Sequence, residues 1–287
     1  MLALSPLIYL TLGFLTGKIF PRLKLSLSIV LAKCIIPFII IWNVSNHFNE
    51  MAWVIIITMT VILLLFSFGQ FFHRSAIKSL CFCYLNIGWL GLPIASSILG
   101  EQSARFMLAA YIGSSIVGNS IGANFLSGKK PSFKKILFSP PVIGLILGGA
   151  FIPMSSVIVA YGQEVYSISK FFMSLFGMMI LGMWLAETKL EVKQSIKSVK
   201  SYFFRVGVLL LIVLSFFTIT ALTNWHGLED YIPVLLLVCL LPPAANIIVL
   251  ETYYLGSGES AQKISYETLC SLVAIAIYGV LIHRVVF

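Results

Sequence analysis

Long apolar stretches separated by short polar segments make up most of this chain of 287 residues. A helix needs about 17 to 25 predominantly apolar residues to cross the hydrocarbon core of a bilayer. Counting such stretches predicts about ten spans, at residues 3–20, 25–45, 51–72, 77–99, 105–127, 137–154, 165–186, 203–223, 231–254 and 265–286. Nine or eleven spans stay open, because the sixth stretch is short and contains Pro153. The pattern predicts an all-α polytopic membrane protein.

Two of the expected spans carry an interruption that a continuous helix does not tolerate well. Residues 86–93 read Asn-Ile-Gly-Trp-Leu-Gly-Leu-Pro, and residues 241–246 read Leu-Pro-Pro-Ala-Ala-Asn. Proline removes a helical hydrogen bond and glycine weakens a helix, so Pro93, Pro242 and Pro243 are expected to break these spans into half-helices. Irregular backbone at membrane depth is tolerated only against protein or a water-filled cavity, and a matched pair of interrupted spans indicates a transporter binding site.

Composition and charge support a membrane protein and argue against nucleic-acid binding. The chain is 59% hydrophobic and 10% charged, whereas soluble domains carry about 25% charged residues. The net charge of +9 comes from cations clustered between apolar runs, as the positive-inside rule describes. Placing both termini outside puts most Lys and Arg residues, Arg205 among them, on the cytoplasmic side and makes the span number even.

Ten spans divide into two halves of five. The first five-helix repeat would be residues 1–128, a cytoplasmic linker would follow at 129–136, and the second repeat would be 137–287. Because five is odd, the second repeat must be inverted relative to the first. The interrupted spans are the fourth of each half, so they are expected to run antiparallel and to cross near the bilayer centre.

The crossing brings together the free ends of the half-helices. Helix amino ends carry partial positive charge and can hold a carboxylate, whereas carbonyl ends can hold a cation. We expect Asn86, Asn246, Gly88 and Gly91 to form the substrate site. The two asparagine side chains can either contact the ligand or satisfy the broken backbone, and both interpretations stay open.

Two ionisable residues inside spans are further candidates, because charge at membrane depth is costly and often functional. Lys33 would attract an anion, or its long side chain would extend back to the membrane surface. Glu251 would couple protons, or would be an interfacial acid or a partner for Lys33. Neither interrupted stretch contains an acidic residue, which argues against sodium binding. The four histidines have no ligand spacing, so we expect no metal, no cofactor, no catalytic residue and no enzyme activity.

The motifs resemble those of the auxin efflux carrier family. Residues 86–93 are similar to its Asn-x-Gly-x-x-Gly-x-Pro signature and residues 242–246 to its Pro-Pro-x-x-Asn segment, while Ser139-Pro140 replaces its usual Asn-Pro. This resemblance implies a fold like that of bile-acid symporters and sodium/proton antiporters, with a scaffold domain and a crossover domain. It implies an organic anion moved by an elevator-type shift, with substrate contacts at Asn86 and Asn246 and the break at Pro93 and Pro243.

The sequence therefore predicts a secondary transporter for a small organic anion, a carboxylate, and the resemblance implies a location in the bacterial inner (plasma) membrane. A sodium- or proton-coupled symporter or ion exchanger on the same fold is the main alternative, and a channel or an intramembrane enzyme is less favoured. The expected partners are the anion and the lipid bilayer, and not nucleic acid. Homodimer formation, the substrate, the direction of transport and the coupling ion are left open.

Overall fold

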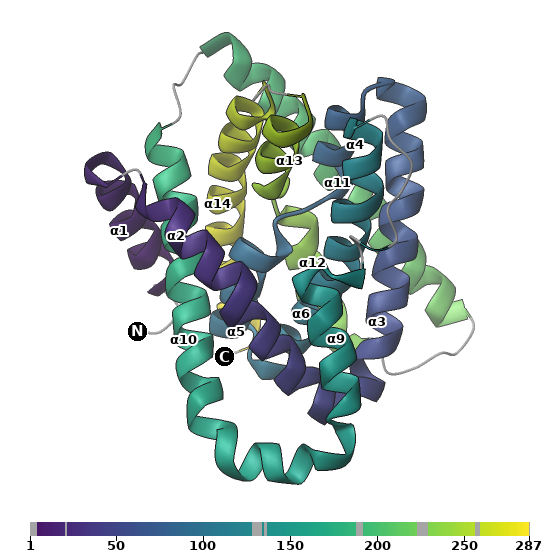
Figure 1. Cartoon of the computed structure of the whole chain (residues 1–287). Helices are drawn as coiled ribbons and strands as arrows, with labels where there is room; N and C mark the ends of the chain where they lie inside the picture. Colours follow the sequence, from purple (N-terminus) through teal and green to yellow (C-terminus); the bar gives the residue numbers. More distant parts are fainter. Residues whose placement is uncertain are drawn as a thin grey trace.

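The computed structural model describes residues 5–20, 22–127, 134, 137–187, 192–222, 229–255 and 259–286. In these residues every regular element is a helix, which confirms the expected all-α class (Figure 1). The expected linker at 129–136 lies outside the described residues apart from Lys134. The helices are α1 (Ser5–Ile19), α2 (Leu23–Val30), η2 (Leu31–Ile35), α3 (Ile36–His73), α4 (Ala76–Cys83), η3 (Ile87–Gly91), α5 (Leu92–Ile98), α6 (Glu101–Val117), η4 (Gly118–Gly122), α7 (Ala123–Ser127), α9 (Pro140–Ala150), η5 (Ile152–Met154), α10 (Ser155–Glu187), α11 (Val192–Leu222), η6 (Glu229–Tyr231), α12 (Ile232–Leu240), α13 (Asn246–Leu255) and α14 (Glu259–Val286).

Within the described residues, four helical stretches are long and apolar enough to cross a membrane. They are Leu23–His73, Ile152–Glu187, Ser195–Ile219 and Ser260–Ile282. Large apolar side chains along them are exposed, such as Leu64, Leu211 and Val273. Such surfaces are costly in water and favourable in lipid, so the structure is compatible with an α-helical membrane protein.

The first of these stretches differs from the expected pattern. A loop was expected between spans 25–45 and 51–72, but α3 continues from Ile36 to His73 and changes direction at His47, where φ is −136° and ψ is 29°. The carbonyl of Trp42, before this kink, accepts hydrogen bonds from Ser45 Oγ at 2.9 Å and Asn46 Nδ2 at 2.7 Å. Side-chain donors thus satisfy backbone that the kink would expose, and no separate loop is needed.

Both interrupted helices are present, but the first break lies earlier than expected. Helix α4 ends at Cys83, residues 84–86 are not helical, and the chain is helical again from Ile87 to Ile98 through η3 and α5. Pro93 lies in the first turn of α5, after the π-helical turn η3. The wider π turn accommodates the proline ring, so Pro93 does not interrupt the helix itself. Pro242 and Pro243 lie between α12 and α13, inside the second break.

The two breaks lie against each other, as expected for crossing helices. Leu85 and Pro243 form an antiparallel bridge. The Asn86 N–H donates to the Pro242 carbonyl at 2.8 Å, and the Ala244 N–H donates to the Tyr84 carbonyl at 2.8 Å. Each break therefore supplies partners for backbone groups that the other has left unpaired. In the view of Figure 1, the interrupted helices lie between the long helices α3 and α10.

Close helix contacts depend on glycine. An added Cβ at Gly144 of α9 would meet Ile40 at 3.0 Å, and one at Gly148 would meet Val44 at 2.7 Å. These small residues therefore let α9 pack closely against the first part of α3. One packing group comprises α1, α2, α9, α10 and the first part of α3. A second comprises α4, α6, α7, α11, α12, α13, α14 and the rest of α3.

Candidate functional site

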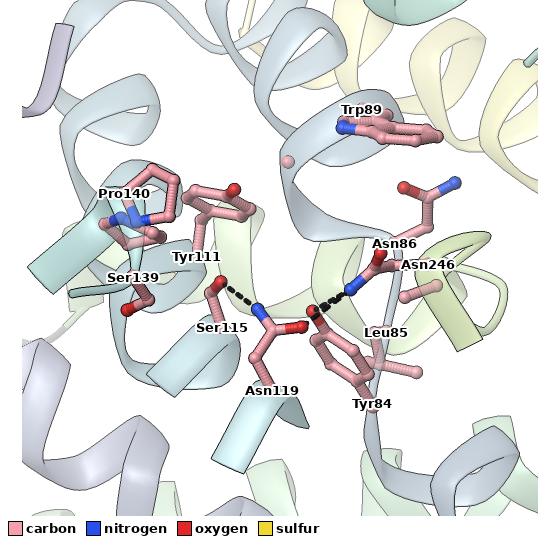
Figure 2. Close-up of a pocket in the computed structure, with 13 residues that line it drawn as sticks. Tyr84, Leu85, Asn86, Trp89, Tyr111, Ser115, Asn119, Ser139, Pro140 and Asn246 are labelled. Carbon is pink, nitrogen blue, oxygen red and sulfur yellow. Dashed lines mark hydrogen bonds between the residues drawn. The ribbon is translucent and has the colours of Figure 1, made fainter. Parts of the chain in front are cut away.

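A cavity of about 250 Å³ lies beside the crossing. Its walls come from the first break, the second break, α6, η4 and the start of α9 (Figure 2). The lining residues are Tyr84, Leu85, Asn86, Gly88, Trp89, Tyr111, Ser115, Asn119, Ser139, Pro140, Pro141, Ala244 and Asn246. This lining brings Asn86, Asn246 and Gly88 together, all three of them predicted site residues.

Three helices begin at this cavity. Asn86 immediately precedes the helix Ile87–Ile98, Asn246 is the first residue of α13, and Ser139 is the N-cap of α9. Each helix start is equivalent to about half a positive charge. None of the described lining residues carries a formal charge, so the field in the cavity comes largely from these amino ends and from amide and hydroxyl dipoles. Such an environment favours an anion. The third helix start, at Ser139, was not part of the predicted site.

A hydrogen-bonded chain of side chains forms one wall of the cavity. Asn246 Nδ2 donates to Asn119 Oδ1 at 2.7 Å, and Asn119 Nδ2 donates to Ser115 Oγ at 2.9 Å. A longer contact of 3.5 Å joins Asn246 Nδ2 to the Tyr84 hydroxyl. Figure 2 shows Tyr84, Asn119 and Asn246 pointing toward one another. Asn119 therefore both faces the cavity and fixes the orientation of the Asn246 amide.

Asn86 has a different environment. The residue is 4% exposed, and its Nδ2 has no hydrogen-bond partner among the described residues. Figure 2 shows this amide on the Trp89 side of the crossing. A buried donor without a partner costs about 1–3 kcal/mol, so this amide is available to a ligand atom or a water molecule.

The two predicted glycines have different roles. Gly88 lines the cavity, and a Cβ there would lie 2.5 Å from the ring of Tyr111. Gly91 is not among the lining residues. A Cβ at Gly91 would lie 2.8 Å from Leu241, so this glycine permits the close approach of the two interrupted helices.

The predicted charged candidates lie away from the cavity lining. Lys33 is exposed within η2. Glu251 is fully buried, and its carboxylate accepts a hydrogen bond of 3.0 Å from the backbone N–H of Ser260 at the start of α14. The carboxylate therefore satisfies a helix amino end inside the protein, and the role of Glu251 in proton coupling or at the membrane interface stays a prediction.

The sequence interpretation missed a buried ion pair at the crossing. Arg205 was counted among the cations on the cytoplasmic side, and its side chain is 1% exposed and forms an ion pair with Glu267, whose side chain is 0% exposed. Arg205 also donates to the carbonyls of Cys81 and Leu241, both at 3.1 Å. An acidic residue therefore does lie at the breaks in space, although neither interrupted stretch contains one. A signal was available, because both residues fall inside expected spans, at 203–223 and 265–286.

Comparison of the sequence with the known protein families and with curated proteins found no match. Among the described residues, no group of three or more His, Cys, Asp or Glu side chains is placed to hold a metal ion.

Proposed function

We propose that this chain is a secondary transporter that moves a small organic anion, a carboxylate, through the cavity at the helix crossing. The observation that carries the proposal is the convergence of three helix amino ends on one cavity whose described lining carries no formal charge. A carboxylate would be stabilised by the partial positive charge of these helix amino ends and would accept hydrogen bonds from the amides of Asn86 and Asn246.

The position of the cavity supports movement by alternating access. Ser139, Pro140 and Pro141 belong to the packing group of α9 and α10, whereas the other lining residues belong to the crossing and to the α6–η4 helix. A ligand held between two packing groups can be exposed to either side when one group slides against the other. The finer proposal is ten spans in two inverted five-helix repeats, with both termini outside and an elevator-type shift, similar to the auxin efflux carrier family. In that topology α9 begins on the cytoplasmic side, so the cavity opens inward.

Counterflow in liposomes tests the proposal. Purified protein would be reconstituted into liposomes that contain unlabelled succinate, 2-oxoglutarate or phenylacetate. The labelled form of the same acid would then be added outside the liposomes. Asn246→Ala removes an amide that faces the ligand, and we expect apparent affinity to fall about 10- to 100-fold, the range for a hydrogen bond to a charged group. Asn86→Ala should have a similar effect.

The matched control is Asn49→Ala, because Asn49 is exposed and lies outside the cavity lining. This variant should transport like the unmodified chain. Full activity in both cavity variants would remove these asparagines from the site. Solute movement without saturation or counterflow would instead indicate a channel.

A sodium- or proton-coupled exchanger is retained as a second candidate, because Glu267 is a buried carboxylate beside both breaks. Its contacts with Arg205 and Lys263 favour a structural carboxylate over an ion ligand. Counterflow measured with and without a sodium or proton gradient separates the two candidates. Accumulation that follows one imposed gradient would identify a coupled carrier.

A further inference from the structure

The four helix ends at the crossing are divided between two sides. The amino ends of the helix 87–98 and of α13 border the cavity. The carbonyl ends, at α4 and α12, lie on the other side and are bound by side chains from α11 and α14. This second side contains no part of the proposed substrate site.

Arg205 is the residue that bonds to both carbonyl ends. One terminal nitrogen of its guanidinium donates to the Cys81 carbonyl in α4, and the other donates to the Leu241 carbonyl after α12, each at 3.1 Å. The same guanidinium forms the ion pair with Glu267 of α14. A planar group with several donors in a fixed geometry can bridge three acceptors in this way, whereas a lysine ammonium is a single point charge.

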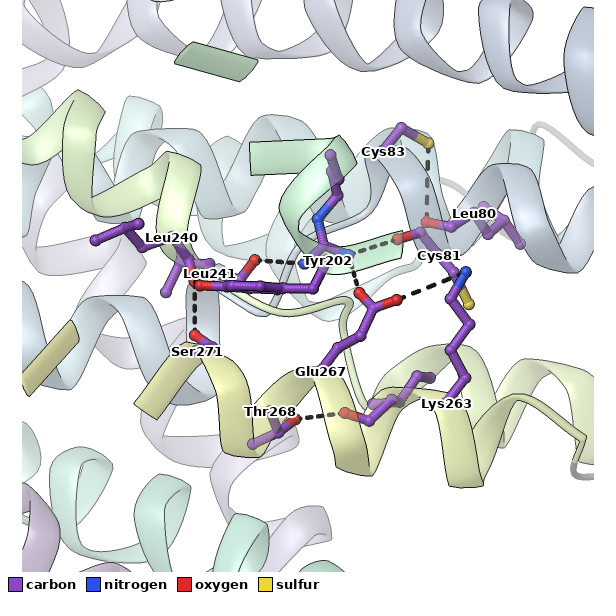
Figure 3. Close-up of polar contacts among 12 residues, drawn as sticks. Leu80, Cys81, Cys83, Tyr202, Leu240, Leu241, Lys263, Glu267, Thr268 and Ser271 are labelled. Atoms are coloured by element: carbon purple, nitrogen blue, oxygen red, sulfur yellow. Dashed lines mark hydrogen bonds and ion pairs between the residues drawn. The ribbon is translucent and has the colours of Figure 1, made fainter. Parts of the chain in front are cut away.

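Further contacts complete the carbonyl side (Figure 3). The Leu240 carbonyl accepts hydrogen bonds from the hydroxyls of Tyr202 at 2.9 Å and Ser271 at 2.6 Å. Glu267 also forms an ion pair with Lys263 at 3.6 Å. The two cations thus face one carboxylate and two carbonyl ends, each end equivalent to about half a negative charge. The charges of this group are close to balanced.

We propose that Arg205 is a positioning residue that joins the carbonyl ends of α4 and α12 and cancels their negative field, so that an anion in the cavity experiences mainly the helix amino ends. This inference rests on the proposed function for its effect on the anion. Its structural part, the joining of the two breaks, stands independently of any substrate.

Hydrogen exchange of the backbone tests the structural part without a ligand. Purified Arg205→Met would be compared with the unmodified chain in peptides that contain Asn86 and Ala244, whose N–H groups make the crossing bonds. We expect exchange there to accelerate by about tenfold or more, while peptides of α1 and α10 keep their rates. Lys197→Met is the matched control, because Lys197 is exposed on the same helix. Uniform acceleration in all peptides, or no change at the breaks, would overturn the proposal.

A double variant separates joining of the carbonyl ends from simple ion pairing. Arg205→Met/Glu267→Leu removes both members of the buried ion pair, so the Glu267 carboxylate is not left buried with Lys263 at 3.6 Å in place of Arg205. If exchange in Arg205→Met were fast only because Glu267 had lost its ion-pair partner, the double variant would recover the slow exchange of the unmodified chain at the breaks. The proposal would then be wrong. If Arg205 acts through the carbonyls, exchange at the breaks stays fast because those acceptors still lack a donor. Arg205→Lys, which keeps the positive charge but not the planar group of donors, should give an intermediate exchange rate at the breaks.

The electrostatic part is read from transport of succinate, 2-oxoglutarate or phenylacetate in the same liposomes. In Arg205→Met we expect the apparent KM to rise about tenfold, with a smaller change in the maximal rate. An unchanged KM would refute the electrostatic role. If the unmodified chain transports none of these acids, the proposed function fails, and the exchange measurements still decide whether Arg205 joins the breaks.

Discussion

At the scale of single residues, the cavity depends on small changes in shape. Gly88 lies at the start of the second half of the first interrupted helix, directly against the Tyr111 ring. Any side chain at this position must displace an aromatic group that lines the cavity. The glycine therefore sets the width of the cavity as well as allowing the close contact.

Replacing Gly88 with alanine tests this role. The new Cβ would lie 2.5 Å from Tyr111, so the ring must shift, at an overpacking cost of about 1–3 kcal/mol. We expect a lower melting temperature in detergent and a weaker apparent affinity for the transported acid. Gly149→Ala is the control, since nothing lies within 4 Å of its added Cβ, and its stability should be unchanged or slightly higher. Equal stability and affinity in the two variants would contradict the argument.

The candidate site was only partly predictable from residue types. Asn86 and Asn246 were found because an amide beside a proline or glycine interruption in an apolar stretch is unusual. The start of α9 at Ser139 and the cation at Arg205 were missed, because their roles depend on helices distant in sequence packing beside the crossing. Sequence spacing carries no information about such contacts.

At the scale of helices, the apolar pattern predicted the helical class and the two interruptions. The pattern misplaced the break in the first interrupted helix, because it assigned the break to Pro93. In the structure the π turn η3 accommodates this proline, and the irregular backbone lies at 84–86. The pattern also predicted a loop where α3 has only a kink at His47. Both errors arise because local propensity identifies strained positions without showing how the backbone relieves the strain.

The contact between α1 and α10 gives a prediction at this scale. An added Cβ at Gly182 would lie 2.1 Å from the Leu10 carbonyl, a contact that a backbone atom cannot relieve without moving the helix. We expect Gly182→Ala to push α1 away from α10 and lower the thermal stability by more than the ~1 kcal/mol that alanine usually adds in a helix. Gly207→Ala, with nothing within 4 Å of the new Cβ, should not lower it. A stable Gly182→Ala protein would show that the two helices are not in such close contact.

At the scale of the whole molecule, an ion pair joins the two packing groups away from the cavity. Lys170 of α10 lies 2.5 Å from Glu101 of α6. In the proposed topology both residues are on the outer side, so this pair closes the outer side while the cavity opens inward. An elevator-type shift would have to break it.

Lys170→Gln should therefore favour the outward-open state slightly. The side chains are 25% and 54% exposed, and such pairs contribute about 0.2–1 kcal/mol, so we expect the population of the outward-open state to rise about 1.4- to fivefold. The measurement is the rate at which an impermeant maleimide labels Ser103→Cys, a buried position in α6. Lys24→Gln, which breaks the α2–α10 pair with Glu187, is the control. An unchanged labelling rate in Lys170→Gln would contradict the outer closure.

The most direct test is an experimental structure in a lipid nanodisc containing the acid that shows counterflow. We predict non-helical backbone at 84–86 and 241–245 in contact, with density for the acid in the cavity between Asn246 and Ser139. Unbroken helices at these residues, separated breaks, or the acid bound elsewhere would contradict it.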